Sequence, residues 1–340
     1  MHNCTDIPPF PDDIPTEQLS IIDYQLLLAG EPSEIEKLYH AAATQGFWYV
    51  KNHGMELLVN AMFRTAEKVL NLPLKDKLEL LQRDHRGAHG YKAKGTVPVD
   101  QHGTRDITEF INISQDDVLA YPTQVHRTYP APLREAMEDV VQPLVRGCVA
   151  MNLAMLAALT GKLQLPNGTL ARLHAYAAGA ESCSELRCLR TSPCQESGRI
   201  ALGAHTDFGS LSAVFNRLGG LQILCPTDGT WKYVKPLPGH IICNVGDALE
   251  FFSGGLLRSS VHRVLPPPGL QAQHERWSIV YFTRPADDVE LRPLAEESSL
   301  IAGAAKAASG SEKLSPGFTA GEWYAKKTAK YLAREHSLPT

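Results

Sequence analysis

The second half of the chain is dense in turns, and this constrains the fold most. Beyond Gly161 the sequence breaks into short stretches of alternating apolar and polar residues, separated by glycine, proline, asparagine and aspartate. Alternation with a period of two is typical of strands with one buried face. Strands are expected at 171–176, 200–205, 210–216, 221–224, 231–234, 240–245, 249–252, 259–264 and 277–283. Short strands at this spacing predict a double-stranded β-helix of the jelly-roll type.

The first half has longer, helical patterns. Helices are expected at 33–45, 55–72, 75–82 and 132–160, with Ser33 as an N-cap, strands at 19–24, 46–54 and 106–113, and a final helix at 321–335. The predicted fold is mainly β with flanking helices. Residues 161–340 would form the jelly-roll core with its C-terminal helix, and residues 1–160 would pack on it as a helical and strand region, in one integrated unit.

Composition excludes several classes of protein. With 340 residues, a formal net charge of −4 and 44% hydrophobic residues, the chain is typical of soluble globular proteins. It has no basic run that would bind nucleic acid or a membrane, no N-terminal secretory pattern, and a longest apolar run, 149–159, too short and too polar to span a bilayer. The seven cysteines lack metal-site spacing, so we expect reduced thiols and a cytoplasmic location, with no obligate protein partner.

A His-x-Asp pair lies in one of the expected strands. His205 and Asp207 are two residues apart, so in a strand their side chains point to the same face. The pair alone is weak evidence, because a chain with 13 histidines meets it by chance. His262, far along the chain, is the best candidate for a third ligand. Two histidines and one carboxylate on one face of a metal favour non-haem Fe(II) and oxygen chemistry.

Arg276 and Ser278 alternate in the same way around Trp277. An arginine inside a barrel needs an anion, because an unpaired buried charge is costly. A carboxylate held by both arms of the guanidinium, with help from a serine hydroxyl, is the natural partner.

These motifs, in this order, resemble the isopenicillin-N-synthase-like family of Fe(II)/2-oxoglutarate-dependent oxygenases. The segment 47–54, Phe-Trp-Tyr-Val-Lys-Asn-His-Gly, is similar to the family's N-terminal segment, and Gly-Gly-Leu-Gln at 219–222, Asn-Val-Gly-Asp at 244–247 and Ser-Gly-Gly at 253–255 are similar to three others. The resemblance covers nearly the whole chain. Within the family the chain resembles fungal and bacterial members, many of which serve secondary metabolism.

The resemblance implies a set of roles. His205, Asp207 and His262 would hold Fe(II), 2-oxoglutarate and dioxygen would take the open positions, and ascorbate could serve as reductant. Arg276 and Ser278 would grip the far carboxylate of 2-oxoglutarate. The substrate would be a small molecule, and the outcome hydroxylation, desaturation or oxidative rearrangement such as ring expansion. The retained Asp207 argues against a halogenase.

Three further site residues are expected around the 177–199 loop. The family often shows Asn-x-Tyr before this loop, and this chain has His174-Ala175-Tyr176. Tyr176 would then contact 2-oxoglutarate, and His174 would replace the family's asparagine, face the substrate, or contact a strand carbonyl. Loops beside a rigid barrel carry specificity, so Arg190 is a candidate for binding a polar or anionic group of the substrate.

Two alternatives stay open. A 2-oxoglutarate-independent Fe(II) oxidase of the same fold could also carry Arg-x-Ser, and stoichiometric succinate release would separate it from the dioxygenase. A non-catalytic binding member is the other, and the intact triad argues against it.

Overall fold

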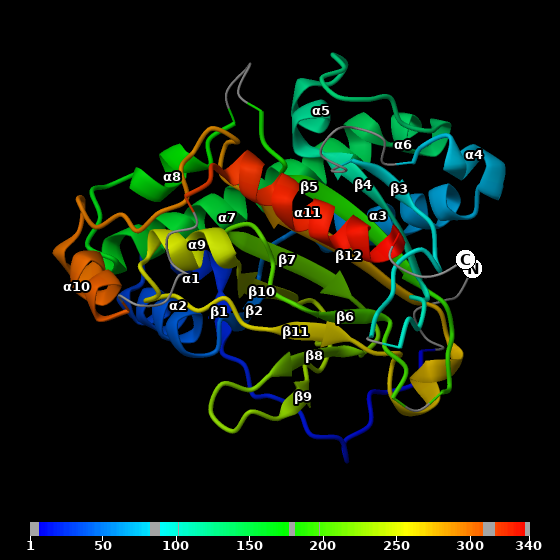
Figure 1. Cartoon of the computed structure of the whole chain (residues 1–340), viewed down its shortest axis with the longest axis horizontal. Coiled ribbons are helices and arrows are strands. Elements are labelled where there is room, and N and C mark those ends of the chain that lie inside the picture. The colour runs from blue at the N-terminus through cyan, green and yellow to red at the C-terminus, as the bar shows by residue number, and fades with distance from the viewer. Residues whose placement is uncertain are drawn as a thin grey trace.

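The computed structural model describes residues 7–81, 89–100, 102–176, 181–196, 198–308 and 317–336. Two sheets form the centre of the molecule (Figure 1). The larger has the strand order β1-β2-β10-β7-β12-β5-β4-β3 and the smaller β6-β11-β8-β9. The strands are β1 Ile21–Asp23, β2 Phe47–Lys51, β3 Gly90–Lys92, β4 Thr108–Ser114, β5 Glu185–Thr191, β6 Leu202–His205, β7 Leu211–Asn216, β8 Leu221–Leu224, β9 Trp231–Tyr233, β10 Ile241–Val245, β11 His262–Val264 and β12 Arg276–Thr283.

The helices lie around the two sheets (Figure 1). They are α1 Tyr24–Leu28, α2 Pro32–Thr44, α3 Glu56–Leu70, α4 Leu74–Leu78, α5 Gln115–Ala120, α6 Ala131–Glu135, α7 Gln142–Lys162, α8 Thr169–Leu173, α9 Asp247–Phe252, α10 Ser299–Ala307 and α11 Ala320–His336, with a π-helical turn η2 Met137–Val141 and a 3-10 turn η3 Gly269–Gln273. Of these, α2, α3, α5 and α7 contact strands of the larger sheet. The jelly-roll prediction is confirmed. The strands β1 to β4 of the first half share the larger sheet with β5, β7, β10 and β12.

Alternation along the strands separates the core from the interior of the jelly roll. In β12, Ile279 and Tyr281 are fully buried in the main apolar core, which α7 completes from the helical side. Val280 and Phe282 point the other way and line a cavity between the sheets. The period of two therefore places one set of side chains in the core and the other set in the site.

Four expectations about elements were wrong. The stretch 171–176 is not a strand, because α8 occupies Thr169–Leu173, and the stretch 249–252 belongs to helix α9. Helix α9 has six residues, all of them buried, which is too few to show a helical period in the sequence. Strand β5 lies within the expected 177–199 loop, of which residues 177–180 and 197 lie outside the described residues. Helix α10 was not expected.

The helix boundaries differ less. Helix α2 begins with Pro32 after the cap Glu31, not at Ser33, because proline suits the first helical position. Helix α4 ends at Leu78, and residue 82 of the expected 75–82 helix lies outside the described residues.

The helical stretch Met137–Lys162 is the one described helix that is long and apolar enough to cross a membrane by length and composition alone. The sequence expectation concerned the run 149–159 alone, and the helical stretch that contains it is longer. Half of its most apolar window is buried inside the protein, and α7 packs against α2, α8 and β12. These are the contacts of a core helix in a globular protein.

His126 provides a pH-dependent contact that stabilises α5. Its Nε2 lies 3.2 Å from Asp116 Oδ2, and this hydrogen bond raises the pKa of His126 although burial opposes the rise. A raised pKa in the folded state means that the stabilisation is complete below the ordinary value and is lost as pH rises through the raised one. We expect His126→Gln to cost on the order of 1 kcal/mol of unfolding free energy at pH 5.5 and little at pH 9. Urea unfolding at both values checks this, and an equal cost at both would contradict it.

Candidate active site

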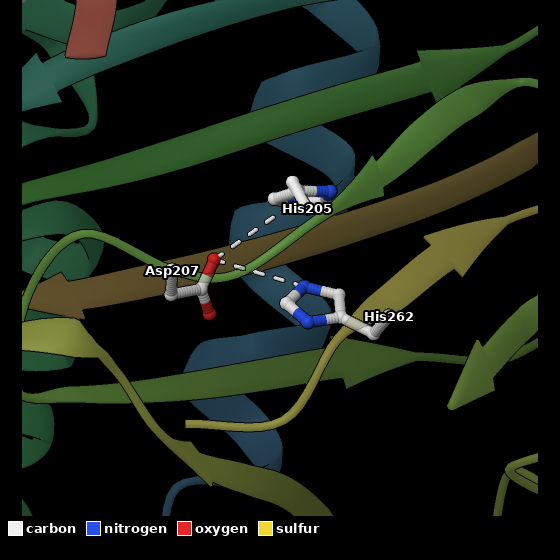
Figure 2. A group of neighbouring side chains, drawn as sticks. All are labelled: His205, Asp207 and His262. Atoms are coloured by element: carbon white, nitrogen blue, oxygen red, sulfur yellow. Dashed lines mark ion pairs between the residues drawn. The ribbon is translucent and has the colours of Figure 1, made fainter. Parts of the chain in front are cut away.

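His205, Asp207 and His262 come together where the small sheet meets the cavity. His205 ends β6 and His262 begins β11, and the antiparallel register makes them direct partners. Asp207 follows β6 by two residues. Its Oδ1 lies 3.8 Å from His205 Nε2 and 3.7 Å from His262 Nε2. Figure 2 shows both imidazoles directed at this carboxylate, and one ligand atom from each residue lies within 4.8 Å of the others.

The remaining atoms of the three side chains are held by neighbours. His205 Nδ1 lies 2.8 Å from the Gly203 carbonyl oxygen and His262 Nδ1 lies 3.2 Å from that of Ser260. Each Nδ1 therefore carries the proton, and each Nε2 lone pair faces the centre.

The second oxygen of Asp207 is used in a similar way. Oδ2 accepts hydrogen bonds from Ser212 Oγ at 2.6 Å and from Asn244 Nδ2 at 2.7 Å. Oδ1 is left facing the two imidazoles. Two nitrogens and one oxygen on one side of a point are a donor set that fits a divalent transition metal with open positions.

Electrostatics keep these groups in their metal-binding forms. Burial, followed by the charge of His262, lowers the pKa of His205 to about 4. Burial opposes ionisation of Asp207, but His262, His205 and the two hydrogen bonds outweigh it and hold its pKa below the ordinary value. At neutral pH His205 is therefore a neutral imidazole and Asp207 a carboxylate, as metal binding requires.

Arg276 and Ser278 line the same cavity. Arg276 is 4% exposed, donates from Nε to the Gly219 carbonyl oxygen at 2.7 Å and from Nη1 to Ser278 Oγ at 3.2 Å. Burial lowers its pKa to about 10, so it stays charged at neutral pH. None of the ion pairs between described residues gives it a carboxylate. The backbone of Gly220 packs directly against this arginine. A Cβ at this position would lie 2.4 Å from the Leu265 carbonyl oxygen and 3.2 Å from Arg276 Nε, and its φ of +113° also favours glycine.

The cavity has a volume of about 790 Å³ and extends from Arg276 to helix α11. This is within the usual range for small-molecule sites. It is lined by alternate residues of β4, β5, β7 and β12, by the three metal-ligand candidates, and by Tyr324 and Thr328 of α11. Helix α11 (red) crosses over β5 and β12 in Figure 1.

The other three sequence candidates lie outside this cavity. Tyr176 follows α8, is 37% exposed and does not line the cavity. His174 is buried beneath the site, with Nε2 2.6 Å from Ser210 Oγ and Nδ1 2.6 Å from the Leu170 carbonyl oxygen. Neither residue lies in a strand, because α8 takes up the first part of the expected strand and both residues follow its last residue, Leu173.

Arg190 is in β5 and points to the opposite face from Arg187. It donates to Glu109 Oε1 at 2.5 and 2.9 Å and stacks over Trp277. Burial opposes ionisation of Glu109, but Lys77, Tyr91 and Arg190 lower its pKa. Arg190 thus neutralises a buried carboxylate and is not placed to contact a substrate.

This correction gives a stability prediction. Arg190→Gln should lower the unfolding free energy by about 1–3 kcal/mol, because Glu109 loses a charged partner but keeps Lys77 and Tyr91. Ligand binding in the cavity should be unchanged. Thermal unfolding, with and without 2-oxoglutarate, measures both effects. An unchanged melting temperature with altered ligand binding would restore the original assignment.

Sequence reasoning missed Thr191 and Arg187 of β5. Thr191 is the strand partner of Arg276, and its Oγ1 lies 2.9 Å from Thr108 Oγ1, so two hydroxyls line the cavity at the Arg276 end. Arg187 lines it farther along the strand. The signal was present as alternation from 185 to 188, and it is broken at Leu189 and Arg190, where the apolar and polar positions exchange faces.

Comparison with known proteins identifies the family of the chain. Residues 180–285 match the family model of the 2OG-Fe(II) oxygenase superfamily, and residues 19–132 match the N-terminal region of the non-haem dioxygenases in morphine synthesis. A 2-oxoglutarate-dependent dioxygenase of Aspergillus fumigatus is 30% identical over 84% of this chain and 80% of its own. Another, frbH of a Dothideomycetidae species, is 31% identical over 80% of this chain and 84% of its own.

Solved structures show the same fold. A full-length Neurospora crassa protein, crystallised in complex with α-ketoglutarate, superimposes with a TM-score of 0.72 over 95% of this chain and 100% of its own, at 22% identity. The chain belongs to the 2OG-Fe(II) oxygenase superfamily, as its motifs predicted. It is an Fe(II)- and 2-oxoglutarate-dependent dioxygenase.

Proposed function

We propose that His205, Asp207 and His262 hold the Fe(II) ion and that Arg276 and Ser278 bind the far carboxylate of 2-oxoglutarate. The enzyme would oxidise a C–H bond of a small molecule in fungal secondary metabolism. One observation carries the assignment: three converging ligand atoms and a buried cation without a carboxylate partner among the described ion pairs line one cavity.

When bound, iron and 2-oxoglutarate would supply, together with dioxygen, the oxidant for the substrate C–H bond, with one oxygen atom of dioxygen used to convert 2-oxoglutarate into succinate and carbon dioxide. The residues of the chain orient and enclose this chemistry. The Gly203 and Ser260 carbonyls fix the imidazole tautomers, and Ser212 and Asn244 fix the carboxylate. Arg276 would hold the cosubstrate by charge-assisted hydrogen bonds.

The size of the cavity and the names of relatives support a small-molecule substrate. A thebaine 6-O-demethylase of Papaver somniferum and a proline hydroxylase of Petromyces alliaceus are each 28% identical to this chain. These substrates differ widely, so the relatives support the reaction class rather than one substrate. We also propose a cytoplasmic location, which the buried, free thiols of Cys148, Cys188 and Cys243 support, and no obligate protein partner.

Anaerobic addition of Fe(II) and then 2-oxoglutarate tests this assignment. A weak visible charge-transfer band should form in the wild type and be absent in His262→Ala. On admission of oxygen, succinate should form in step with 2-oxoglutarate loss. A band that persists in His262→Ala would refute the ligand assignment. Iron binding without a band would favour the 2-oxoglutarate-independent oxidase.

A further inference from the structure

Five side chains at the α11 end of the cavity alternate aromatic rings with guanidinium groups; we call them the arginine ladder. Its members are Phe110, Arg187, Phe282, Arg284 and Tyr324, and all of them line the cavity. Arg187 Cζ lies 4.3 Å from the Phe110 ring centre and 5.0 Å from that of Phe282. Arg284 Cζ lies 5.1 Å from Phe282 and 4.7 Å from Tyr324. Stacking on aromatic faces fixes both guanidinium groups in position.

One buried carboxylate, that of Glu185, forms ion pairs with both arginines. Glu185 is fully buried, and its Oε1 accepts from Arg187 Nη2 at 2.8 Å and from Arg284 Nη2 at 3.2 Å. Glu185 does not line the cavity. Two cations and one carboxylate leave this end of the cavity with one net positive charge.

Arg187 lines the cavity and has a donor group, Nη1, that can bind a ligand. Its Nε donates to Asn112 Oδ1 at 2.7 Å and its Nη2 to Glu185, and among the described residues none accepts a hydrogen bond from Nη1. Its side chain is 20% exposed. Arg284 is 6% exposed, donates from Nη1 to the Cys183 carbonyl oxygen, and has a buried Nε without a partner among the described residues. Arg187 is therefore the arginine that can receive a ligand.

The ladder is distant from Arg276 but close to the metal-ligand candidates. Along β5, Arg187 is four residues from Thr191, the partner of Arg276, and this corresponds to about 13 Å of strand. Asp207 accepts from Ser212, whose strand partner is Phe282 of the ladder.

The charges at the Arg276 end already balance under the proposed function. Fe(II), the Asp207 carboxylate and dianionic 2-oxoglutarate together carry one negative charge, which Arg276 offsets. Of the described lining residues, Asp100 is the other acid, and its Oδ1 accepts from the backbone of His102 and Thr104 in its own turn. The positive charge of the ladder therefore remains for the substrate.

We propose that Arg187 binds a carboxylate of the substrate, and that the substrate class is an apolar monocarboxylic acid. This rests on the proposed function, which places the substrate beside the metal. Arg187 presents a planar donor fork to the carboxylate. Phe208, Val280 and Phe282 give the apolar walls for the rest of the molecule.

Matched ligand pairs test the proposal. Protein loaded anaerobically with Fe(II) and 2-oxoglutarate is titrated with trans-cinnamic acid and cinnamamide, and with further acid and amide pairs of similar size. Perturbation of the charge-transfer band and an equilibrium binding measurement report on each. We expect acids to bind roughly tenfold or more tightly than their amides. Arg187→Gln should reduce this preference to about threefold or less, and Arg187→Lys should keep part of it, because it keeps the charge and loses the fork.

Arg217→Gln is the matched control, since Arg217 also stacks on a ring, at 4.4 Å from the Phe63 centre, but does not line the cavity. It should leave the acid preference unchanged. The proposal would be overturned if acid and amide bound equally well. It would also be overturned if neither member of any pair bound to protein whose charge-transfer band is intact. Acids that abolish the band by competing at Arg276 would overturn it as well. If the wild type loaded with Fe(II) and 2-oxoglutarate shows no charge-transfer band before any acid or amide is added, the proposed function itself fails. If Arg187→Gln does not fold, the wild-type pairs still decide.

Discussion

Asp207→Ala is expected to abolish Fe(II) binding at micromolar metal and, with it, all 2-oxoglutarate turnover. Asp207 supplies the one anionic ligand of the candidate triad, and its Oδ1 is the atom on which both imidazoles converge. Without it, two neutral imidazoles face a divalent ion, and the charge that favours binding is gone. Anaerobic equilibrium dialysis with metal analysis measures the loss directly.

Asn244→Ala gives a graded control for this loss. Asn244 donates to Asp207 Oδ2 at 2.7 Å and orients the carboxylate without touching the metal position. Removal of such outer partners typically costs about 10- to 100-fold in metal affinity. We therefore expect Asn244→Ala to weaken binding by this amount and Asp207→Ala to weaken it more. Equal affinities for Asp207→Ala and the wild type would place the metal elsewhere.

The sequence predicted the candidate metal residues because their geometry is local or marked by motifs. His205 and Asp207 share a face through strand alternation alone. His262 is distant in sequence, and its pairing with His205 across β6 and β11 is a tertiary fact that only the family resemblance could supply. Arg276 and Ser278 followed from alternation in the same way.

The site residues that the structure places outside the cavity were misjudged for two other reasons. Arg190 and Arg187 lie three residues apart in β5, on opposite faces, and the sequence does not say which face is the cavity. The choice is made by buried partners, Glu109 for Arg190 and Glu185 for Arg187, which come from other parts of the chain or from the strand itself. Polar residues on both faces also removed the apolar alternation that identifies a strand. For Tyr176, helix α8 occupies the first part of the expected strand, and Tyr176 follows the helix without lining the cavity.

Arg276→Gln is expected to weaken 2-oxoglutarate binding roughly 10- to 150-fold, since hydrogen bonds to a charged group contribute about 1.5–3 kcal/mol. Arg276 is buried with its Nε fixed on Gly219, so its position does not depend on the ligand. The variant should lose affinity for 2-oxoglutarate and keep its affinity for Fe(II). The hydrogen bonds of Arg276 to described residues go to Gly219 and Ser278, and to none of the three metal-ligand candidates. Anaerobic titration calorimetry with Fe(II) present measures the 2-oxoglutarate affinity.

Two further variants separate charge from geometry at this position. Arg276→Lys keeps the charge but loses the two-armed donor, and should recover only part of the affinity. Ser278→Ala removes one hydroxyl near the guanidinium, 3.2 Å from Nη1, and should cost about 1 kcal/mol, or roughly fivefold. Fe(II) affinity without 2-oxoglutarate should stay at the wild-type value in all three variants. If Arg276→Gln bound 2-oxoglutarate as tightly as the wild type, the far carboxylate would have to lie elsewhere, and Arg187 would become the alternative anchor.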